Sequence, residues 1–66
     1  MTGRDFLKGR RIPIVRDGHT HSGVIREVLG VSGAGQQLGI WLEQSNEMIY
    51  VSIPEDDERL QEDYPQ

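Results

Sequence analysis

The chain has 66 residues, a formal net charge of −4 at pH 7 and no cysteine, which excludes disulfide bonds and thiolate metal sites. Its length is that of one small domain, whose core supplies only about 3–5 kcal/mol of net stability, so we expect association with a partner to supplement it. No apolar run approaches the roughly 20 residues that span a membrane and no signal peptide is recognisable, so we expect a cytoplasmic protein without membrane contact.

Charge is distributed unevenly along the sequence. The first sixteen residues carry five basic side chains and one acidic one, whereas the last twelve carry six acidic side chains and one basic one. We therefore divide the chain into a basic N-terminal segment (residues 1–11), a small barrel (residues 12–54) and an acidic C-terminal segment (residues 55–66). Runs of like charge are usually solvated, which predicts a mobile acidic tail. The alternative is a tail that folds over the basic segment or imitates nucleic acid.

The first third of the chain predicts a helical turn and a hairpin. Residues 5–9 suit one short helical turn that ends at a glycine. Residues 11–16 have the pattern of a strand, and Pro13 lacks the N–H of a ladder donor, so this strand lies at a sheet edge or begins at the proline. The Asp17-Gly18 pair that follows is typical of a tight hairpin turn, which requires positive φ.

The second predicted strand covers residues 22–31 and changes its inward face along its length. Val24 and Val28 lie on one parity of the strand, whereas Ile25 and Leu29 lie on the other. A strongly bent strand has this pattern, because the side that faces the core changes along it. Glycines near both of its ends ease the bending.

Two more strands precede the acidic segment. In "QLGIWLEQ" three aliphatic residues alternate with Trp41 and its neighbours, and in "MIYVSI" three more alternate with Met48 and Tyr50. The aliphatic residues of each run share one face, which we assign to the core. Pro54 ends the fourth strand, and "SIPE" fits a helical capping box. Residues 55–61 therefore stay open between a helical turn, a fifth strand and a disordered tail.

These elements predict an all-β fold, a small SH3/Sm-like barrel of four to five strongly bent antiparallel strands with a short N-terminal helical turn and an acidic C-terminal tail. The stretch "GRRIPIVRDGHTHSGVIREV" resembles the first half of the Sm/LSm signature, in which a strand, an Asp-Gly turn and a glycine precede a bent second strand. The resemblance implies barrel shape and ring-type assembly. The RNA-reading residues of that family have no counterpart, because "GVSGAGQQ" and "SIPEDD" stand in their two places.

A second stretch resembles part of another family. "VLGVSGAGQQLGI" is similar to the "VLGVxGxxVxxGI" run of the carbon-storage-regulator family, and Arg10-Arg11 precedes it as an Arg-Arg pair does in that family. This partial resemblance implies an RNA-binding all-β dimer. The Ala-Pro turn and the basic last strand of the family are missing here.

Three features that resemble chemical sites have simpler explanations. The glycines of "GVSGAGQQLG" lead into a strand and not into the helix N-terminus that a phosphate cradle needs, so we expect a hairpin loop. His19 and His21 have the spacing of two metal ligands on a strand face, but Asp17 is the only near third ligand, so we expect no metal. No nucleophile–base pair is recognisable and so small a barrel has no room for a substrate pocket, so we expect neither enzymatic activity nor a cofactor.

Outward aromatic residues predict a protein-binding surface. If the aliphatic residues of the last two strands face the core, the aromatic residues between them form an apolar patch outside it. We assign six residues to partner binding: Trp41, Tyr50, Met48, Ser32, Gly33 and Gln36. The alternative is that Trp41 covers the open end of the barrel as part of an enlarged core. We expect a non-catalytic module, a small regulator or inhibitor, that forms a homo-oligomer and docks an unidentified protein.

The alternative function is that of an Sm-like RNA-binding oligomer. Its phosphate contacts would come from the basic N-terminal region: Lys8, Arg10, Arg11 and Arg16. The acidic remainder of the chain opposes a polyanion. A further alternative is that these arginines pair with the acidic tail or with a neighbouring subunit.

Overall fold

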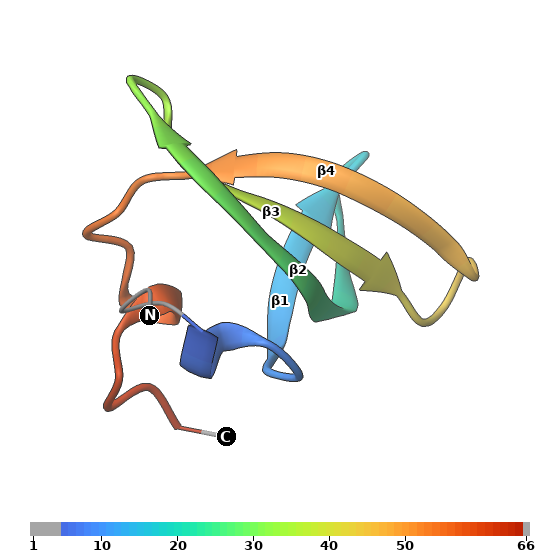
Figure 1. The fold of residues 1–66 in the computed structure, drawn as a ribbon. Helices are drawn as coiled ribbons and strands as arrows, with labels where there is room; N and C mark the ends of the chain where they lie inside the picture. The colour runs from blue at the N-terminus through green and yellow to red at the C-terminus, as the bar shows by residue number, and fades with distance from the viewer. Residues whose placement is uncertain (1–4, 66) are drawn as a thin grey trace.

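The computed structural model describes residues 5–65 as one sheet of four antiparallel strands with two short 3-10 turns. The strands are β1 (Arg11–Arg16), β2 (His19–Ser32), β3 (Gly35–Leu42) and β4 (Glu47–Ile53), each paired with its neighbours in the chain (Figure 1). The turns are η1 (Asp5–Leu7) and η2 (Glu58–Leu60), which lie beside each other at one end of the sheet (Figure 1). The fold is therefore mostly β, and no α-helix occurs among residues 5–65.

The turn between β1 and β2 forms as its sequence predicts. Asp17 and Gly18 have φ values of 54° and 77°. Both values are positive, as the two central residues of a tight type I′ hairpin turn require. The resulting hairpin pairs β1 with β2 alone, so Pro13 lies in an edge strand, one of the two places expected for it.

The glycine-rich stretch forms the hairpin connection expected from the sequence, but most of it is strand and only a short part is loop. Ser32 pairs with Gly35, so only residues 33–34 form the turn between β2 and β3. Gly35 has a φ of 119°, and a Cβ atom there would clash with the carbonyl oxygen of Ile53 in β4. The glycine therefore permits the close approach of two main chains rather than a mobile connection.

Two irregularities in β2 explain why its apolar residues occupy both parities. The register of β2 against β3 shifts between Ile25 and Glu27 and again between Val28 and Val31. Ile25 is buried before the first shift, and Val28 packs against the same core after it. An extra residue in one strand reverses which parity points inward, so the predicted change of face along this strand is confirmed.

A single apolar cluster forms the core and draws on every element. Its buried members are Leu7, Ile12, Ile14, Ile25, Leu38, Ile40, Leu42, Ile53 and Leu60. Leu60 of η2 is 0% exposed, and Tyr64 packs against the same cluster. The acidic segment is therefore packed on the core through these two side chains, whereas the sequence had predicted a mobile tail. Burial of apolar surface outweighs the solvation tendency of the acids around it, because those acids stay at the surface.

The sheet is not closed within the described residues. β1 and β4 are its two edges, with a gap lined by Ile14, Val15, Val51, Ile53 and Arg59. Arg59 Nη1 donates a hydrogen bond of 2.7 Å to the carbonyl oxygen of Pro13 at the β1 edge. The C-terminal segment thus caps a carbonyl of this edge without adding a fifth strand, and the observed architecture is an open four-stranded sheet.

Candidate protein-binding face

The side of the sheet opposite the core carries a row of apolar side chains. Val24, Trp41 and Met48 are direct cross-strand neighbours on β2, β3 and β4. On β3 Trp41 alternates with buried residues such as Ile40, so the row points away from the core. Tyr50 lies on the same side of β4 and is 63% exposed. The structure therefore places the three predicted residues Trp41, Met48 and Tyr50 on one face.

Gly39 lets three side chains close over the middle of this face. A Cβ atom at Gly39 would lie 2.9 Å from Met48 Cε, 3.0 Å from Tyr50 Cε1 and 3.1 Å from Glu27 Cβ. All three side chains therefore converge above the glycine, in space that the side chain of any other residue would need. A thioether, an aromatic ring and an acidic side chain are in this way gathered into one patch.

Arg26 and Glu27 both belong to this face because of the first irregularity in β2. Glu27 pairs with Gly39, which leaves Arg26 as the extra residue of a bulge. The guanidinium carbon of Arg26 lies 5.4 Å from the centroid of the Trp41 ring, a cation–π contact. We term six residues the outer face: Val24, Arg26, Glu27, Trp41, Met48 and Tyr50.

Sequence reasoning did not identify this charged pair, although the pattern contains a signal for it. Ile25 and Val28 are both directed at the core, and the two charged residues stand between them. Two inward residues separated by two polar ones do not fit the period of 2 of a regular strand, whereas a bulge accounts for them. The parity change thus marks Arg26 and Glu27 as residues on the solvent side.

The tip of the β2–β3 hairpin is separate from the outer face. Ser32 and Gly33 are exposed at this tip, as their assignment to partner binding requires. Trp41, however, lies six residues along β3 from Gly35, which is a distance of about 20 Å in an extended strand. The structure therefore does not bring the loop residues and the aromatic residues into one site.

Gln36 is buried, which corrects its assignment to partner binding. Its side chain is 1% exposed and shares the inward parity of Leu38. Its Nε2 donates hydrogen bonds to the carbonyl oxygens of Leu29 at 2.6 Å and of Gln37 at 3.2 Å. A buried amide needs such partners, so Gln36 supports the hairpin and is not accessible to another protein.

The basic residues predicted for nucleic-acid binding do not form an unpaired cluster. Arg11 Nε and Nη2 donate to the two carboxylate oxygens of Glu43, at 2.9 Å and 3.0 Å. Arg16 Nη1 donates to Glu47 Oε1 at 2.6 Å. Lys8 is exposed near the N-terminal turn. The expected pairing of these arginines with the acidic tail is therefore wrong for Arg11 and Arg16, whose acids belong to the β3–β4 hairpin.

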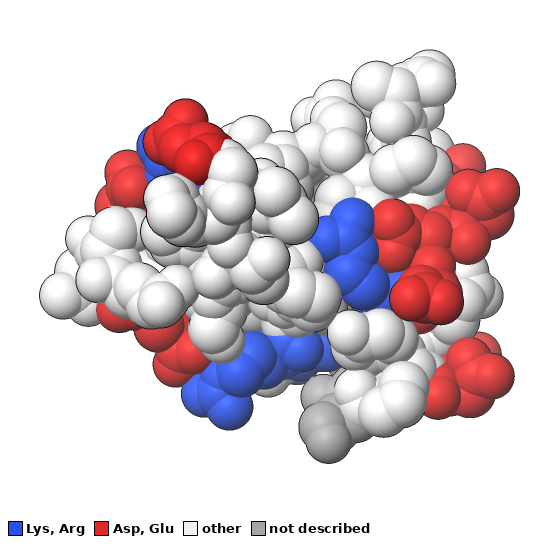
Figure 2. All heavy atoms as spheres, turned by 180° about the vertical axis from the view of Figure 1, so that it is seen from behind, with Lys and Arg blue, Asp and Glu red and all other residues white. Residues whose placement is uncertain are grey.

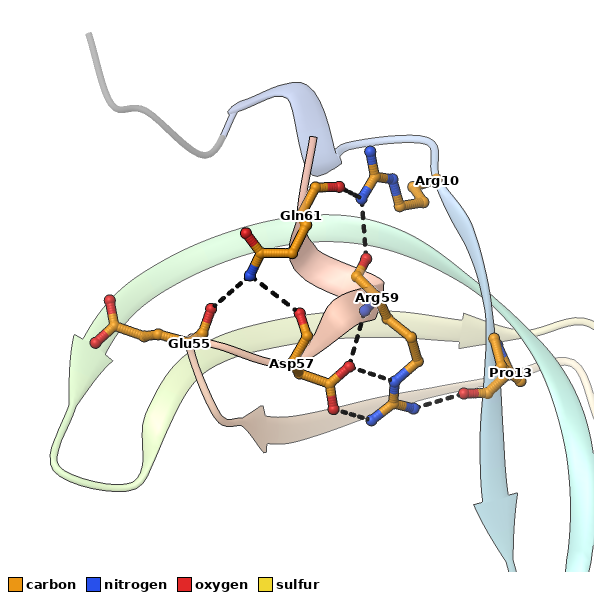
Figure 3. Close-up of polar contacts among 6 residues, drawn as sticks. All are labelled: Arg10, Pro13, Glu55, Asp57, Arg59 and Gln61. Carbon is orange, nitrogen blue, oxygen red and sulfur yellow. Dashed lines mark hydrogen bonds and ion pairs between the residues drawn. The ribbon is translucent and has the colours of Figure 1, made fainter. Parts of the chain in front are cut away.

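Arg10 is enclosed by the two terminal segments. It is therefore not accessible to a phosphate, which corrects its predicted role in nucleic-acid binding. The Arg10 side chain is 5% exposed. Its Nη1 donates hydrogen bonds to the carbonyl oxygens of Arg59 at 2.9 Å and of Gln61 at 2.7 Å (Figure 3). Its guanidinium carbon lies 5.2 Å from the ring centroid of Phe6 and 5.7 Å from that of Tyr64. Arg10 therefore joins the N-terminal segment to the main chain of the C-terminal segment.

Arg59 anchors the same segment from within it. Its Nε and Nη2 donate to the two carboxylate oxygens of Asp57, both at 2.9 Å, while Nη1 reaches the edge carbonyl of Pro13 (Figure 3). Asp57 Oδ1 also accepts from the Arg59 N–H and so caps η2, whereas Ser52, the cap expected from the sequence, lies in β4. The side-chain hydrogen bonds from Arg59 hold the pKa of the Asp57 carboxyl below its ordinary value.

A shallow groove on the β1–β2 hairpin is the second candidate site. It is lined by Pro13, Thr20, His21, Ser22 and the Arg11–Glu43 pair, among others. Hydrogen bonds from Arg11, followed by one of 3.0 Å from Ser22 Oγ, hold the pKa of Glu43 below its ordinary value. His21 Nδ1 is buried and has no hydrogen-bond partner. The charged groups of the groove are paired with each other, so the groove presents no unpaired charge to a ligand.

The C-terminal segment keeps its acidic side chains at the surface. Figure 2 shows acidic atoms at both sides of the rear face, with basic atoms next to those on the right. The exposed acids of the C-terminal segment are Glu55, Asp56, Glu58, Glu62 and Asp63. Their exposure lets the segment bury Leu60 while its charges remain in water. Among residues 5–65, no three His, Cys, Asp or Glu side chains are grouped so that they could hold a metal ion.

Comparisons with known proteins identify no relative. No protein-family model, no curated protein and no solved structure matches the chain. The part of the chain that the structure describes contains no helix long and apolar enough to cross a membrane. The resemblances to the Sm/LSm and carbon-storage-regulator families therefore stay predictions.

Proposed function

We propose that this chain is a non-catalytic protein-binding module that binds another protein through its outer face. The observation that carries the proposal is the convergence of Trp41, Met48 and Tyr50 on one side of the sheet, with Tyr50 63% exposed. Aromatic side chains and methionine are enriched at protein interfaces, and Trp and Tyr dominate the residues that contribute most binding energy. A chain with so small a core also gains stability when a partner covers part of its surface.

We further infer that the open sheet is an SH3-like barrel with one gap, and that the protein is cytoplasmic and forms a homo-oligomer. Support for the barrel comes from β2, which pairs with β1 from His19 to Val24 and with β3 from Gly23 to Ser32. One strand that pairs with different neighbours along its length curves the sheet around a single core. Support for the homo-oligomer comes from the composition of the outer face.

The RNA-binding alternative has weaker support. Arg10 is buried between two aromatic rings, and Arg11 and Arg16 are each paired with a glutamate. Binding of a phosphate by either paired arginine would first have to break its ion pair. The net charge of −4 opposes long-range attraction of a polyanion. Cross-linking in a ribosome-free cell extract that still contains RNA allows binding of protein and binding of RNA to be compared directly.

Photo-cross-linking at Tyr50 tests the proposed binding face. Tyr50 is replaced by p-benzoylphenylalanine, which keeps an aromatic ring at this exposed position. Val15, which is 73% exposed on β1, receives the same replacement as a control outside the outer face. Irradiation of purified protein, and separately of protein in cell extract, should give discrete protein adducts from position 50 and none from position 15.

The adducts identify which part of the proposal holds. Adducts at position 50 that disappear when Trp41→Ala is added support a specific interface, because truncation of a central aromatic residue commonly weakens binding by 2 kcal/mol or more, roughly thirtyfold. If ribonuclease digests the adducts, the partner is RNA, and the RNA-binding alternative would replace the proposed protein binding. Equal labelling from positions 50 and 15, or no adducts at all, would reject the outer face as a binding surface.

A further inference from the structure

We infer that the occupant of the outer face is a second copy of this chain, related by a two-fold axis that places Arg26 of each copy against Glu27 of the other. This inference rests on the proposed function, since it uses the same face. It is carried by a separate observation, the presence of opposite charges side by side on a face that is otherwise apolar.

The bulge in β2 creates this pair of charges. In a regular strand Arg26 and Glu27 would point to opposite sides of the sheet. Here Arg26 lies over Trp41, and Glu27 lies beside Tyr50 and Met48, so both residues are on the solvent side. The face therefore presents a cation and an anion at adjacent positions, each next to an aromatic ring.

Two-fold symmetry makes such a face complementary to itself. In an interface of this kind, a contact from residue i of one copy to residue j of its partner is repeated from j to i. Opposing two outer faces forms two Arg26–Glu27 pairs at once, with the aromatic residues of both copies beside them. An unrelated partner would have to present a matching pair of charges on an apolar surface, whereas a second copy already has it.

Both charges are available for such a contact. Within residues 5–65, no ion pair or hydrogen bond involves the carboxylate of Glu27, which is exposed. Arg26 is exposed and stacks on the ring of Trp41, and no hydrogen bond or ion pair of its guanidinium occurs within the described residues. The other glutamates near the sheet, Glu43 and Glu47, are already paired with arginines of β1. Glu27 is thus the acid on this side of the sheet that has no partner among residues 5–65.

The size of the face sets the expected affinity. A strand of seven residues is about 23 Å long and three strands span about 14 Å, so the footprint is on the order of 300 Å² before side-chain relief. Stable interfaces bury about 800 Å² on each partner, and smaller ones are usually weak and transient. We therefore expect a dimer with a dissociation constant in the micromolar range, between about 10 and 300 μM.

Reversal of the charges at Arg26 and Glu27 distinguishes a contact between two copies from a structural role of these residues within one chain. Arg26→Glu gives a chain with two negative charges at the bulge, and Glu27→Arg gives one with two positive charges. Each variant alone should oppose like charges, which raises its dissociation constant at least about tenfold. An equimolar mixture of the two variants restores both opposite-charge pairs, so it should form a heterodimer more tightly than either variant forms a homodimer.

Sedimentation velocity from 5 μM to 1 mM measures these equilibria, with a monomer mass of 7.5 kDa. Lys8→Glu and Asp63→Arg are matched controls, because they make the same changes of charge at exposed positions outside the outer face. These controls, alone or mixed, should dimerise like the original chain. Far-UV circular dichroism and thermal unfolding of every variant identify any that fail to fold, and for those Arg26→Gln and Glu27→Gln replace the reversals, with weakened association expected.

Three results would overturn the inference. They are a monomer throughout the concentration range, dimers that are unaffected by both reversals, and a mixture that associates no better than its components. If the chain is monomeric but Tyr50 still cross-links to a different protein, the outer face remains a binding surface and only the second copy is rejected. If position 50 gives no adducts at all, the proposed function fails as well.

Discussion

Replacement of Arg10 by methionine tests how the C-terminal segment is held. The change removes two charged hydrogen bonds from Nη1, to the carbonyl oxygens of Arg59 and Gln61, and two cation–π contacts with aromatic rings. Hydrogen bonds to charged groups contribute about 1.5–3 kcal/mol each, and a cation–π contact contributes about 0.5–2 kcal/mol. Methionine retains the apolar packing, and the unpaired Nε of Arg10 is a cost that the substitution removes. We therefore expect a loss of about 2–4 kcal/mol.

A loss of this size is a large part of the stability of so small a domain, about 3–5 kcal/mol. Urea unfolding at pH 7 measures the loss in the free energy of unfolding, and hydrogen exchange shows which part of the chain loses protection. The amides of Leu60 and Gln61, which donate to the carbonyl oxygens of Asp57 and Glu58, should lose protection first. Arg11→Met is the matched control, because its ion pair with Glu43 is at the surface and contributes little. Equal unfolding midpoints for Arg10→Met and the original chain would refute the assignment of Arg10 as the residue that holds the segment.

Two other substitutions follow from the packing and the charges. Gly23→Ala should destabilise the domain by about 1–3 kcal/mol in urea unfolding, because the added Cβ would lie 2.6 Å from Ile40 Cγ2 and 3.1 Å from Ile14 Cγ1. At Gly30 an added Cβ has no atom within 4 Å, so Gly30→Ala should change stability by less than about 1 kcal/mol. Equal losses of stability at the two glycines would contradict this reasoning. Asp57→Asn tests how stability depends on pH. The pKa of Asp57 is lower in the folded state, because its carboxylate is paired with Arg59. The pair therefore stabilises the fold fully above the ordinary carboxyl pKa of 3.8, and this stabilisation is lost as the pH falls through the lower folded value. The stability difference between the original chain and Asp57→Asn should therefore be largest near pH 6 and shrink below pH 4, and a difference that does not change with pH would exclude this ion pair as its source.

The strands, the first turn and the inward faces of β3 and β4 follow from local pattern. Alternation of aliphatic and other residues places Leu38, Ile40 and Leu42 in the core and leaves Trp41 outside, as the structure has it. The Asp17-Gly18 turn is equally local, since it depends on the φ preferences of two adjacent residues. Such features involve residues only a few positions apart, so they are readable without knowledge of the fold.

The positions of Arg10 and Gln36 are not readable in this way. A basic residue in a basic segment and an amide next to glycines both have the pattern of exposed positions. Arg10 is buried because the carbonyl groups that accept its hydrogen bonds come from 49 and 51 residues away. The same distance in sequence explains why the acidic segment was expected to be mobile: Leu60 becomes a core residue only when η2 packs beside η1 (Figure 1).

By itself, the amino-acid sequence determines that this protein is a small all-β domain with one aliphatic and one aromatic side to its later strands. The tertiary structure decides which charges are available, because pairing across the sheet neutralises Arg11 and Arg16 and the meeting of the two ends encloses Arg10. It also decides that Arg26 and Glu27 share the outer face, since a bulge depends on how two strands align and not on either strand alone. Periodicity is a property of one segment, whereas charge pairing and register are properties of two.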